Sequence, residues 1–302
     1  MLQIGVVSLE NKLIIAILLV SLVVVHSNVA SACVGARPLA MGASFIGLAD
    51  DINAVYWNPA GLVQLENTEI TWTRTLNNRD IINYDDFLAV GTYDPKSGLA
   101  YAVGYINIAD YYPVGYTDDF SLVYQDNKIR WFICSLATKL NEQLSIGGNI
   151  RLMDFGLRYE TEGYWPVADS ATFMGVDLSF FYQANEQLSL GLLIQDFNRP
   201  KFKVLGQDLY YIRNVRPGIA YRFTNSFLIT ASIYDLLEEV EMDNRFRVGM
   251  EVEVENIRIR AGLDRGNMTL GLGITGLYFV IDYALLGDDL GDTHMLGVII
   301  PL

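Results

Sequence analysis

The chain has 302 residues, of which 51% are apolar and 19% are charged, so it can build a core of considerable size. Its formal net charge of −14 argues against nucleic acid as a partner, because a phosphate backbone is bound by clustered lysine and arginine side chains. Its two cysteines, Cys33 and Cys134, are too few for a disulfide framework.

The N-terminus has the pattern of an export signal. Lys12 supplies the positive end, residues 13–25 form an apolar run interrupted only by Ser21, and small residues end at Ala32, where cleavage is expected. The apolar run is shorter than the roughly 20 residues that a membrane-spanning helix needs. We therefore predict a signal peptide over residues 1–32. Cleavage would leave Cys33 first in the mature chain, and whether it is then lipidated stays open.

Residues 33–66 are rich in Ala and Gly and lack strand alternation. The stretch "DDINAVYWNPAGL", from Asp50 to Leu62, joins two acids to an Asn-Pro break. The residue before a proline avoids helical geometry and proline favours the first helical position, so we expect a short helical turn from Pro59. A soluble linker is the alternative, although the segment carries many large apolar groups for one.

From about residue 69 the sequence alternates with period two, which predicts β-strands. In 144–152 the aliphatic residues share one face and Ser145, Asn149 and Arg151 share the other, whereas in 268–275 the second face holds only Thr and Gly. We expect fourteen strands, with twelve as the alternative count. They lie near residues 69–76, 81–93, 99–109, 128–139, 144–158, 171–183, 188–199, 213–223, 227–236, 244–255, 257–265, 268–275, 277–286 and 293–301.

One face of each strand is apolar and the other is small or polar, so the two faces suit different environments. A soluble β-sandwich also alternates, but long aliphatic faces opposite small and charged residues, behind an export signal, favour a transmembrane barrel with a polar lumen. We predict an all-β fold: a closed antiparallel transmembrane β-barrel of about 14 strands over residues 67–302. Residues 33–66 would fill the lumen as a partly helical plug, because neither their acids nor their interrupted backbone can face lipid.

The connections and the aromatic residues fit this barrel. Tight connections such as 141–143 and 185–187 predict periplasmic turns, and longer ones at 111–126, 160–170 and 200–213 predict external loops. Aromatic residues on the lipid face can sit at the level of the headgroups, although aromatics also favour strands generally. Those expected there are Trp72, Tyr84, Tyr101, Tyr105, Tyr182, Tyr221, Phe223 and Tyr283.

Charged residues point into the lumen by parity and can pair across strands, with each other and with the plug. The alternative is that they simply fill a wet interior. The principal ones are Arg151, Arg216, Arg222, Arg245, Arg247, Glu251, Glu253, Arg258, Arg260 and Asp282, joined by Asp177 and Asp264. His294 would be the only histidine left after cleavage, which removes most catalytic triads and His-based metal sites. We predict no enzyme, no cofactor and no metal.

The segment "GARPLAMGASFIGLADDINAVYWNPAGL" resembles the N-terminal signature of the FadL-like outer-membrane proteins, especially the PorV/PorQ branch. The resemblance implies a fourteen-stranded barrel in the bacterial outer membrane with the N-terminal segment folded into its lumen. It also implies a gating or ligand-contact role for the plug motif, which comprises Arg37, Asp50, Asp51, Trp57, Asn58, Pro59 and Gly61. Over the remaining chain the likeness is architectural.

Two functions follow from the resemblance. The first is a passive channel for hydrophobic small molecules of the long-chain fatty acid type, gated by the plug. The alternative is a non-transporting scaffold or a PorV-like component of type IX protein secretion, with secretion-system proteins as partners. The aromatic loop sequences "ADYYPVGYTDDF" and "YETEGYWPVADS" motivate the alternative. The sequence leaves a lateral opening in the wall undecided.

Overall fold

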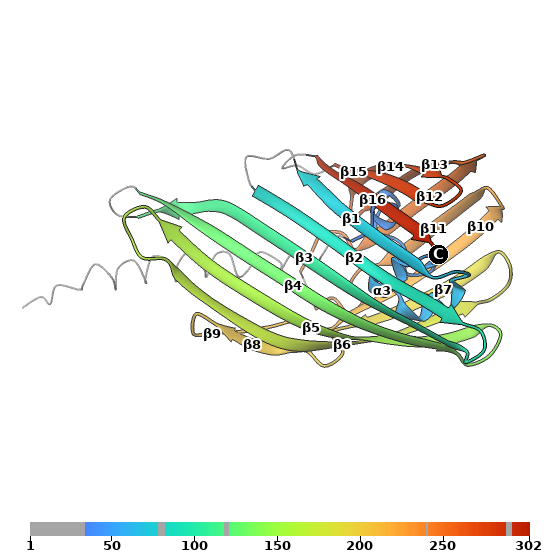
Figure 1. The fold of residues 1–302 in the computed structure, drawn as a ribbon, viewed down its shortest axis with the longest axis horizontal. Coiled ribbons are helices and arrows are strands. Elements are labelled where there is room, and N and C mark those ends of the chain that lie inside the picture. Colours follow the sequence, from blue (N-terminus) through green and yellow to red (C-terminus); the bar gives the residue numbers. More distant parts are fainter. Residues whose placement is uncertain (1–33, 78–81, 118–120, 240, 288–291) are drawn as a thin grey trace, which may run out of the picture.

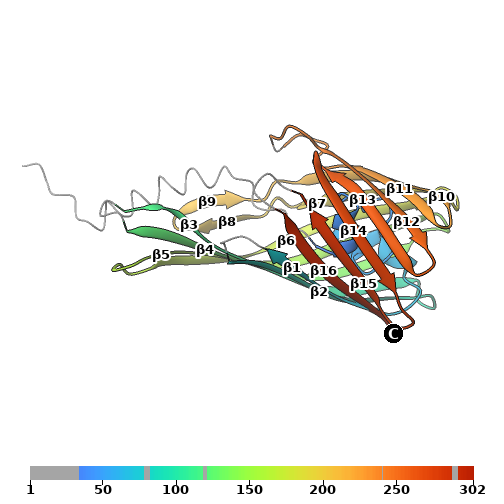
Figure 2. The same cartoon turned by 90° about the horizontal axis from the view of Figure 1, so that it is seen from above.

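The computed structural model describes residues 34–77, 82–117, 121–239, 241–287 and 292–302. They form a closed antiparallel barrel of fourteen strands around an N-terminal segment (Figures 1 and 2). The predicted signal peptide and Cys33 lie outside the described residues. Among those residues, no helix combines the length and the apolar character needed to cross a membrane.

The strands hydrogen-bond to their neighbours in chain order, and β1 closes the barrel by pairing with β16. Only β8 and β9 stand apart, as a separate hairpin between β7 and β10. The strands are β1 Glu69–Asn77, β2 Ile82–Asp94, β3 Leu99–Tyr116, β4 Leu122–Lys139, β5 Leu144–Thr161, β6 Val167–Gln183, β7 Leu188–Gln195, β8 Lys201–Val204, β9 Gln207–Tyr210, β10 Asn214–Thr224, β11 Phe227–Ile233, β12 Phe246–Val254, β13 Ile257–Asp264, β14 Asn267–Thr275, β15 Val280–Leu286 and β16 Thr293–Pro301.

The predicted fold class and strand count are therefore confirmed, and alternation separates the two faces of the wall. On β14, Met268, Leu270, Leu272 and Ile274 are exposed while Thr269 is 1% exposed. The aliphatic faces point outward, as a barrel in lipid requires. Of the aromatic residues expected outside, those with exposed side chains are Trp72, Tyr101, Tyr182, Tyr221 and Phe223.

Two predicted external loops are wrong in extent. β3, β4, β5 and β6 continue through most of 111–126 and 160–170, so this part of the wall rises beyond the rest (Figure 1). Apolar alternation stops there because charged side chains replace the outward aliphatics, although inward residues such as Val123 and Gln125 stay buried. The third predicted loop, 200–213, contains the β8–β9 hairpin. At the C-terminal side, β15 begins at Val280 and not at 277.

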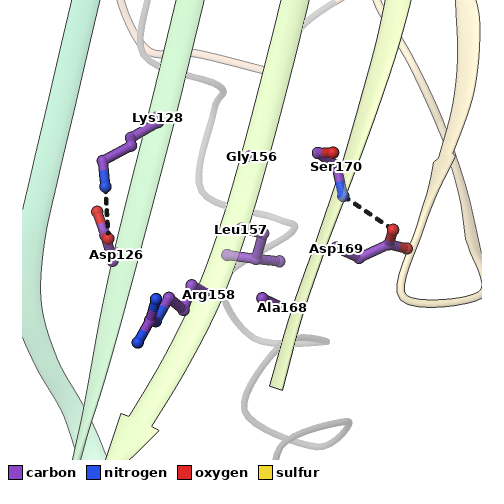
Figure 3. Close-up of a pocket in the computed structure, with 8 residues that line it drawn as sticks. All are labelled: Asp126, Lys128, Gly156, Leu157, Arg158, Ala168, Asp169 and Ser170. Atoms are coloured by element: carbon purple, nitrogen blue, oxygen red, sulfur yellow. Dashed lines mark hydrogen bonds and ion pairs between the residues drawn. The ribbon is translucent and has the colours of Figure 1, made fainter. Parts of the chain in front are cut away.

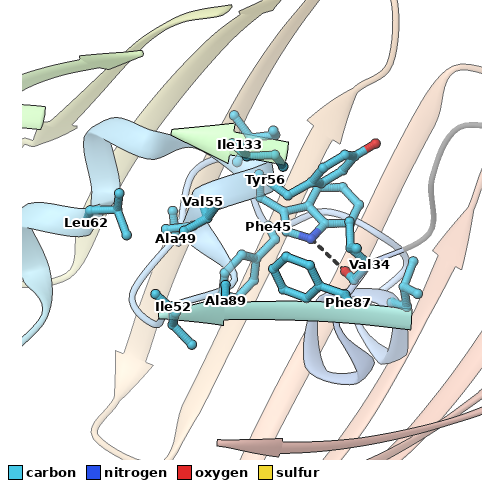
Figure 4. Packing of buried hydrophobic residues seen from close by; sticks show 14 of the residues in the cluster. Val34, Phe45, Ala49, Ile52, Val55, Tyr56, Leu62, Phe87, Ala89 and Ile133 are labelled. Atoms are coloured by element: carbon cyan, nitrogen blue, oxygen red, sulfur yellow. Dashed lines mark hydrogen bonds between the residues drawn. The ribbon is translucent and has the colours of Figure 1, made fainter. Parts of the chain in front are cut away.

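The N-terminal segment fills the lumen with two short helices and a 3-10 helix, α2 Ala36–Ala40, α3 Ala54–Trp57 and η1 Pro59–Gln64, whose start matches the turn expected at Pro59. Nearly all its residues are buried, and Figure 4 shows its apolar side chains packed against the inner wall. We call residues 34–66 the plug.

Small inward residues of the wall let the plug backbone come close. A β-carbon at Gly191 would collide with the Ile46 carbonyl, and one at Gly271 would collide with Ala40. Gly147 and Gly249 face the plug backbone in the same way. The alternating Gly positions of the strands therefore form the floor on which the plug lies.

Inward hydroxyl groups satisfy the irregular backbone of the plug. Ser189 donates to the Gly47 carbonyl at 2.7 Å, Ser145 donates to the Ala60 carbonyl at 2.9 Å, and Thr269 donates to the Ala40 carbonyl at 3.1 Å. These bonds take the place of the water that a broken backbone would otherwise need.

Candidate functional site

Arg37, on α2, ties the plug to itself and to the wall. Its Nη1 donates to Asp50 at 2.6 Å and to Asp51 at 2.8 Å, while Nε and Nη2 each donate to Glu251 of β12 at 2.9 Å. Because a guanidinium holds carboxylates in a planar fork, this geometry is a strong tie. The two acids of "DDINAVYWNPAGL" are thus partners of an arginine thirteen and fourteen residues earlier.

The chain of charges continues through the wall. Glu251 also accepts from Arg260 of β13 at 2.6 Å, and Arg260 donates to Asp282 of β15 at 2.6 Å. All three side chains are buried. We call the buried inward charged residues of β12–β15 the ionic sector; they comprise Arg247, Glu251, Arg260, Asp264 and Asp282.

Burial and charge shift the plug groups in different directions. Burial by itself would lower the pKa of Arg37, but Asp50, Glu251 and Asp51 together raise it well above its ordinary value. Burial raises the pKa of Asp51, and the opposing effect of Arg37 does not cancel that shift. Arg37 therefore stays charged, while the ionised form of Asp51 is less stable in the fold than in water.

The opposite side of the lumen is apolar. Inward residues of β2, β3 and β4 contact α3 and its flanks, where Ile52, Val55 and Tyr56 pack beside Phe87 and Ile133 (Figure 4). We call the inward residues of these strands that share one hydrophobic cluster with the plug the apolar sector; they comprise Phe87, Ala89, Ala100, Ala102, Ile106, Ile108, Ile129, Trp131, Ile133 and Ala137. The Trp57 indole donates to the Val34 carbonyl at 2.9 Å and so joins α3 to the first residue of the plug.

An aromatic cluster lies next to α3. Tyr56 of the plug stacks on Trp131 with ring centroids 6.3 Å apart, and Tyr211 meets Trp131 edge to face at 6.3 Å. Phe202 of the β8–β9 hairpin stacks on Phe173 at 4.1 Å. The aromatic cluster comprises Tyr56, Trp131, Phe155, Phe173, Phe202 and Tyr211.

Arg151 of β5 borders this cluster. Its guanidinium carbon lies 4.8 Å from the Trp131 ring centroid, and its Nη2 pairs with Asp177 at 2.8 Å and with Asp196 at 2.7 Å. All three charged groups are buried. A buried arginine that is paired and stacked on an indole holds the wall and the cluster in one arrangement.

Arg216 of β10 differs from the other inward arginines. It is 3% exposed, and its Nε and Nη1 have no hydrogen-bond partner. Its guanidinium carbon lies 4.4 Å from the Tyr234 ring centroid, and that of Arg247 lies 4.6 Å from the same centroid. Asp264 pairs with Arg247 at 2.7 Å. Arg216 is thus a buried cation with unused donors inside the barrel.

The remaining predicted site residues lie in other settings. Asn58 caps η1 by accepting from Ala60, and its amide donates to the Ile46 and Phe180 carbonyls. Gly61 lies against Ala49, where a β-carbon would collide. Pro59 is the first residue of η1 and is buried.

Four predicted lumen charges lie at the edge of the buried network or outside it. Arg222 is half-buried and lies 3.7 Å from Asp50, at the mouth of the barrel. Arg258 and Glu253 pair with each other at 3.1 Å with partly exposed side chains. Arg245 precedes β12 and donates to the Met242 carbonyl at 3.3 Å. Parity correctly indicates the face of a strand, but it does not indicate the depth in the lumen.

The aromatic cluster was not predicted from the sequence. Trp131, Phe155 and Phe173 all occupy inward parity positions, which is the signal that points to them. Within the described residues, no group of three or more His, Cys, Asp or Glu side chains is arranged to hold a metal ion. The only free cysteine among them, Cys134, is exposed on the outer face of β4.

No protein-family model matches the sequence, and no curated protein matches it. Solved structures do share the fold. The CymD monoaromatic hydrocarbon channel aligns with a TM-score of 0.67 and 11% identity over 89% of this chain and 97% of its own. The toluene transporter TbuX of Ralstonia pickettii aligns with a TM-score of 0.66 and 13% identity over 89% and 97%. A FadL homologue of Pseudomonas aeruginosa aligns with a TM-score of 0.63 and 11% identity over 86% and 96%. The barrel with an enclosed N-terminal segment is therefore a FadL-like fold.

Proposed function

We propose that this chain is a bacterial outer-membrane protein of the FadL-like group that passively conducts hydrophobic small molecules past its plug. The observation that carries the proposal is the contact between the aromatic cluster and the plug, made by Tyr56 on Trp131. An apolar ligand resting on this cluster would touch the gate itself. The shared fold of structures named as hydrocarbon and toluene channels supports the same proposal.

The aromatic cluster and Arg216 together favour a ligand with an apolar body and a polar end. Asp196 pairs with Arg151 beside Trp131, and it also interacts electrostatically with Arg216 and Tyr211. Arg216 can therefore offer its unused N–H groups to a polar end while the rings hold the body. This combination favours the long-chain fatty acid type over a plain hydrocarbon.

Uptake in a bacterial host that lacks its own channel tests the proposal. Expression of the chain is expected to raise uptake of a labelled long-chain fatty acid, and Trp131→Ala is expected to reduce that uptake about tenfold because the ring that contacts the gate is lost. The matched control is Phe132→Ala, which removes the neighbouring ring on the lipid face, where Phe132 is 57% exposed.

The control variant is expected to transport like the unmodified chain. Equal losses in the two variants, or no uptake above that of the empty host, would contradict the channel proposal. Uptake of toluene is measured in parallel with an Arg216→Gln variant, which is expected to reduce fatty acid uptake and to spare toluene.

The secretion scaffold of the PorV type is a second proposal, favoured by one observation. Trp165, between β5 and β6 at the end of the raised wall, is 93% exposed, and Tyr116 at the end of β3 is 68% exposed. Exposed aromatic residues are typical anchors of protein interfaces. Cross-linking from position 165 in the native host is expected to capture an exported or secretion protein if the scaffold proposal holds, and capture of none would reject it.

A further inference from the structure

A groove on the outer face of β4, β5 and β6 takes no part in the lumen. It encloses about 410 Å³, and Figure 3 shows the side chains around it. Gly156 lies in register between Lys128 and Ser170 and leaves the space open, since it has no side chain. The lining residues are Asp126, Lys128, Gly156, Leu157, Arg158, Ala168, Asp169 and Ser170.

The groove lies just beyond the apolar band of the barrel. One register row of the outer face reads Phe132, Leu152 and Met174, and the next reads Arg130, Asp154 and Thr172. Ten residues of tilted strand separate Leu140, at the opposite rim, from Arg130. Ten residues climb about 25 Å at the usual rise and tilt, which is the height of the apolar band in such barrels.

The side chains at this level expose positive charge. Lys128 is 47% exposed while its partner Asp126 is 17% exposed, and Arg158 is 48% exposed while its partner Glu160 is 37% exposed. Arg130 is likewise more exposed than Asp154, at 45% against 38%. Each pair therefore hides its carboxylate more than its cation.

The Asp169 carboxylate at the edge of the groove is held by backbone donors. It accepts from the Leu205 backbone at 2.7 Å and from the Ser170 backbone at 2.8 Å. It thus serves to hold the β8–β9 hairpin to β6. Lys128 and Arg158 each carry further N–H groups beside the one that pairs with a carboxylate, and together with the Ser170 hydroxyl these groups are a donor set for phosphate.

We propose that this groove binds the phosphate-bearing headgroup of an outer-leaflet lipid. The inference rests on the proposed outer-membrane location, which brings lipid to this face. A phosphate in the groove would be contacted by Lys128 and Arg158 while the acyl chains lie along Phe132, Leu152 and Met174. Basic pockets next to an apolar membrane surface bind lipid headgroups in the same manner.

Native mass spectrometry of the purified full chain in a maltoside detergent tests this proposal. The probe is lipid A carrying two phosphates. The variant Lys128→Gln/Arg158→Gln is expected to retain about tenfold less lipid, because two charge-assisted contacts are lost. The matched control, Lys201→Gln/Lys203→Gln, removes two exposed lysines from β8 and is expected to retain lipid like the unmodified chain.

Dephosphorylated lipid A is expected to bind weakly to every form. Equal binding of the two lipids, or equal retention by the groove variant, would overturn the proposal. Displacement of the lipid by inorganic phosphate at the same concentration would overturn the assignment to a lipid. Fatty acid uptake by the groove variant is expected to be unchanged. The uptake and lipid-retention measurements therefore test the channel proposal and the lipid proposal independently.

Discussion

The two sides of the lumen hold the plug by different interactions, ion pairs at one side and apolar packing at the other. At the ionic sector, α2 is tied by Arg37 to Glu251 and lies on inward glycines such as Gly271. At the apolar sector, α3 packs against aliphatic and aromatic groups, with Val55 beside Gly104. Ion pairs in a buried setting are costly to break one partner at a time, whereas apolar contacts can be exchanged for those of an apolar ligand.

This difference predicts which end of the plug moves. An apolar ligand can replace the contacts of α3 at little cost in free energy, but it offers nothing to the carboxylates around Arg37. We therefore expect α2 to be the anchor and α3 to be the moving part. Three sets of variants test this assignment.

Two disulfide locks should give the largest effect. In Val55→Cys/Gly104→Cys, the new bond joins α3 to β3, since a β-carbon at Gly104 would lie 3.0 Å from the Val55 side chain. In Ala36→Cys/Gly297→Cys, it joins α2 to β16, where a β-carbon at Gly297 would lie 3.2 Å from the Ala36 β-carbon. The first lock is expected to lower fatty acid uptake more than about tenfold until a reductant is added, as expected for a gate held shut.

The second lock is expected to leave uptake near the unmodified level. Uptake is measured before and after reduction in both variants, with each single cysteine variant as a control. A block by the α2 lock and none by the α3 lock would reverse the assignment of anchor and moving part.

Removal of Arg37 should give the next largest effect. Arg37→Gln leaves Asp51 buried without its cation and removes one of the two arginines that bind Glu251, and we expect the free energy of unfolding to fall by about 3–5 kcal/mol. Urea unfolding in lipid vesicles measures the loss. The control Arg130→Gln, on the outer face, is expected to cost about 1 kcal/mol or less, as exposed pairs do.

A double variant separates the charge from the packing of the Arg37 side chain. Arg37→Gln/Glu251→Gln should lose less than the sum of the two single changes, because the carboxylate that has lost its contact with Arg37 is also neutralised. Simple additivity would show that the tie between plug and wall is not electrostatic.

Neutralising Asp51 should give the smallest effect. The raised pKa means that the folded state binds a proton on Asp51 more readily than the unfolded chain, so this group's contribution is full at low pH and is lost as the pH rises through the folded pKa. Asp51→Asn removes that dependence, and its Oδ1 can still accept from the Asn53 backbone.

The expected change in unfolding free energy for Asp51→Asn is within about 1 kcal/mol, and it should become more favourable to the variant as the pH rises. Urea unfolding at a series of pH values above and below neutrality measures this trend. A large loss of stability at every pH would show that ionised Asp51 is a necessary partner of Arg37.

Alternation along the chain was sufficient to predict the barrel, because a wall between lipid and a polar lumen imposes period two on every strand. The same parity placed Arg151, Arg216 and Arg260 in the lumen. It could not predict that Arg258 lies near the rim and Arg260 lies deep, since depth depends on stagger between strands. Nor could it find Phe202, because the four-residue strands of the β8–β9 hairpin are too short to show a period.

The pairing of β1 with β16 also limits the order in which the contacts of the barrel can form. Glu69 lies opposite Pro301, and Arg37 binds Glu251 across a separation of 214 residues. The segment that is synthesised early is therefore among the last to gain its partners, since its anchoring strands leave the ribosome near the end of the chain. Until then its carboxylates and irregular backbone must stay hydrated or bound to a chaperone. The final strand then closes the wall around a plug that was synthesised before any strand.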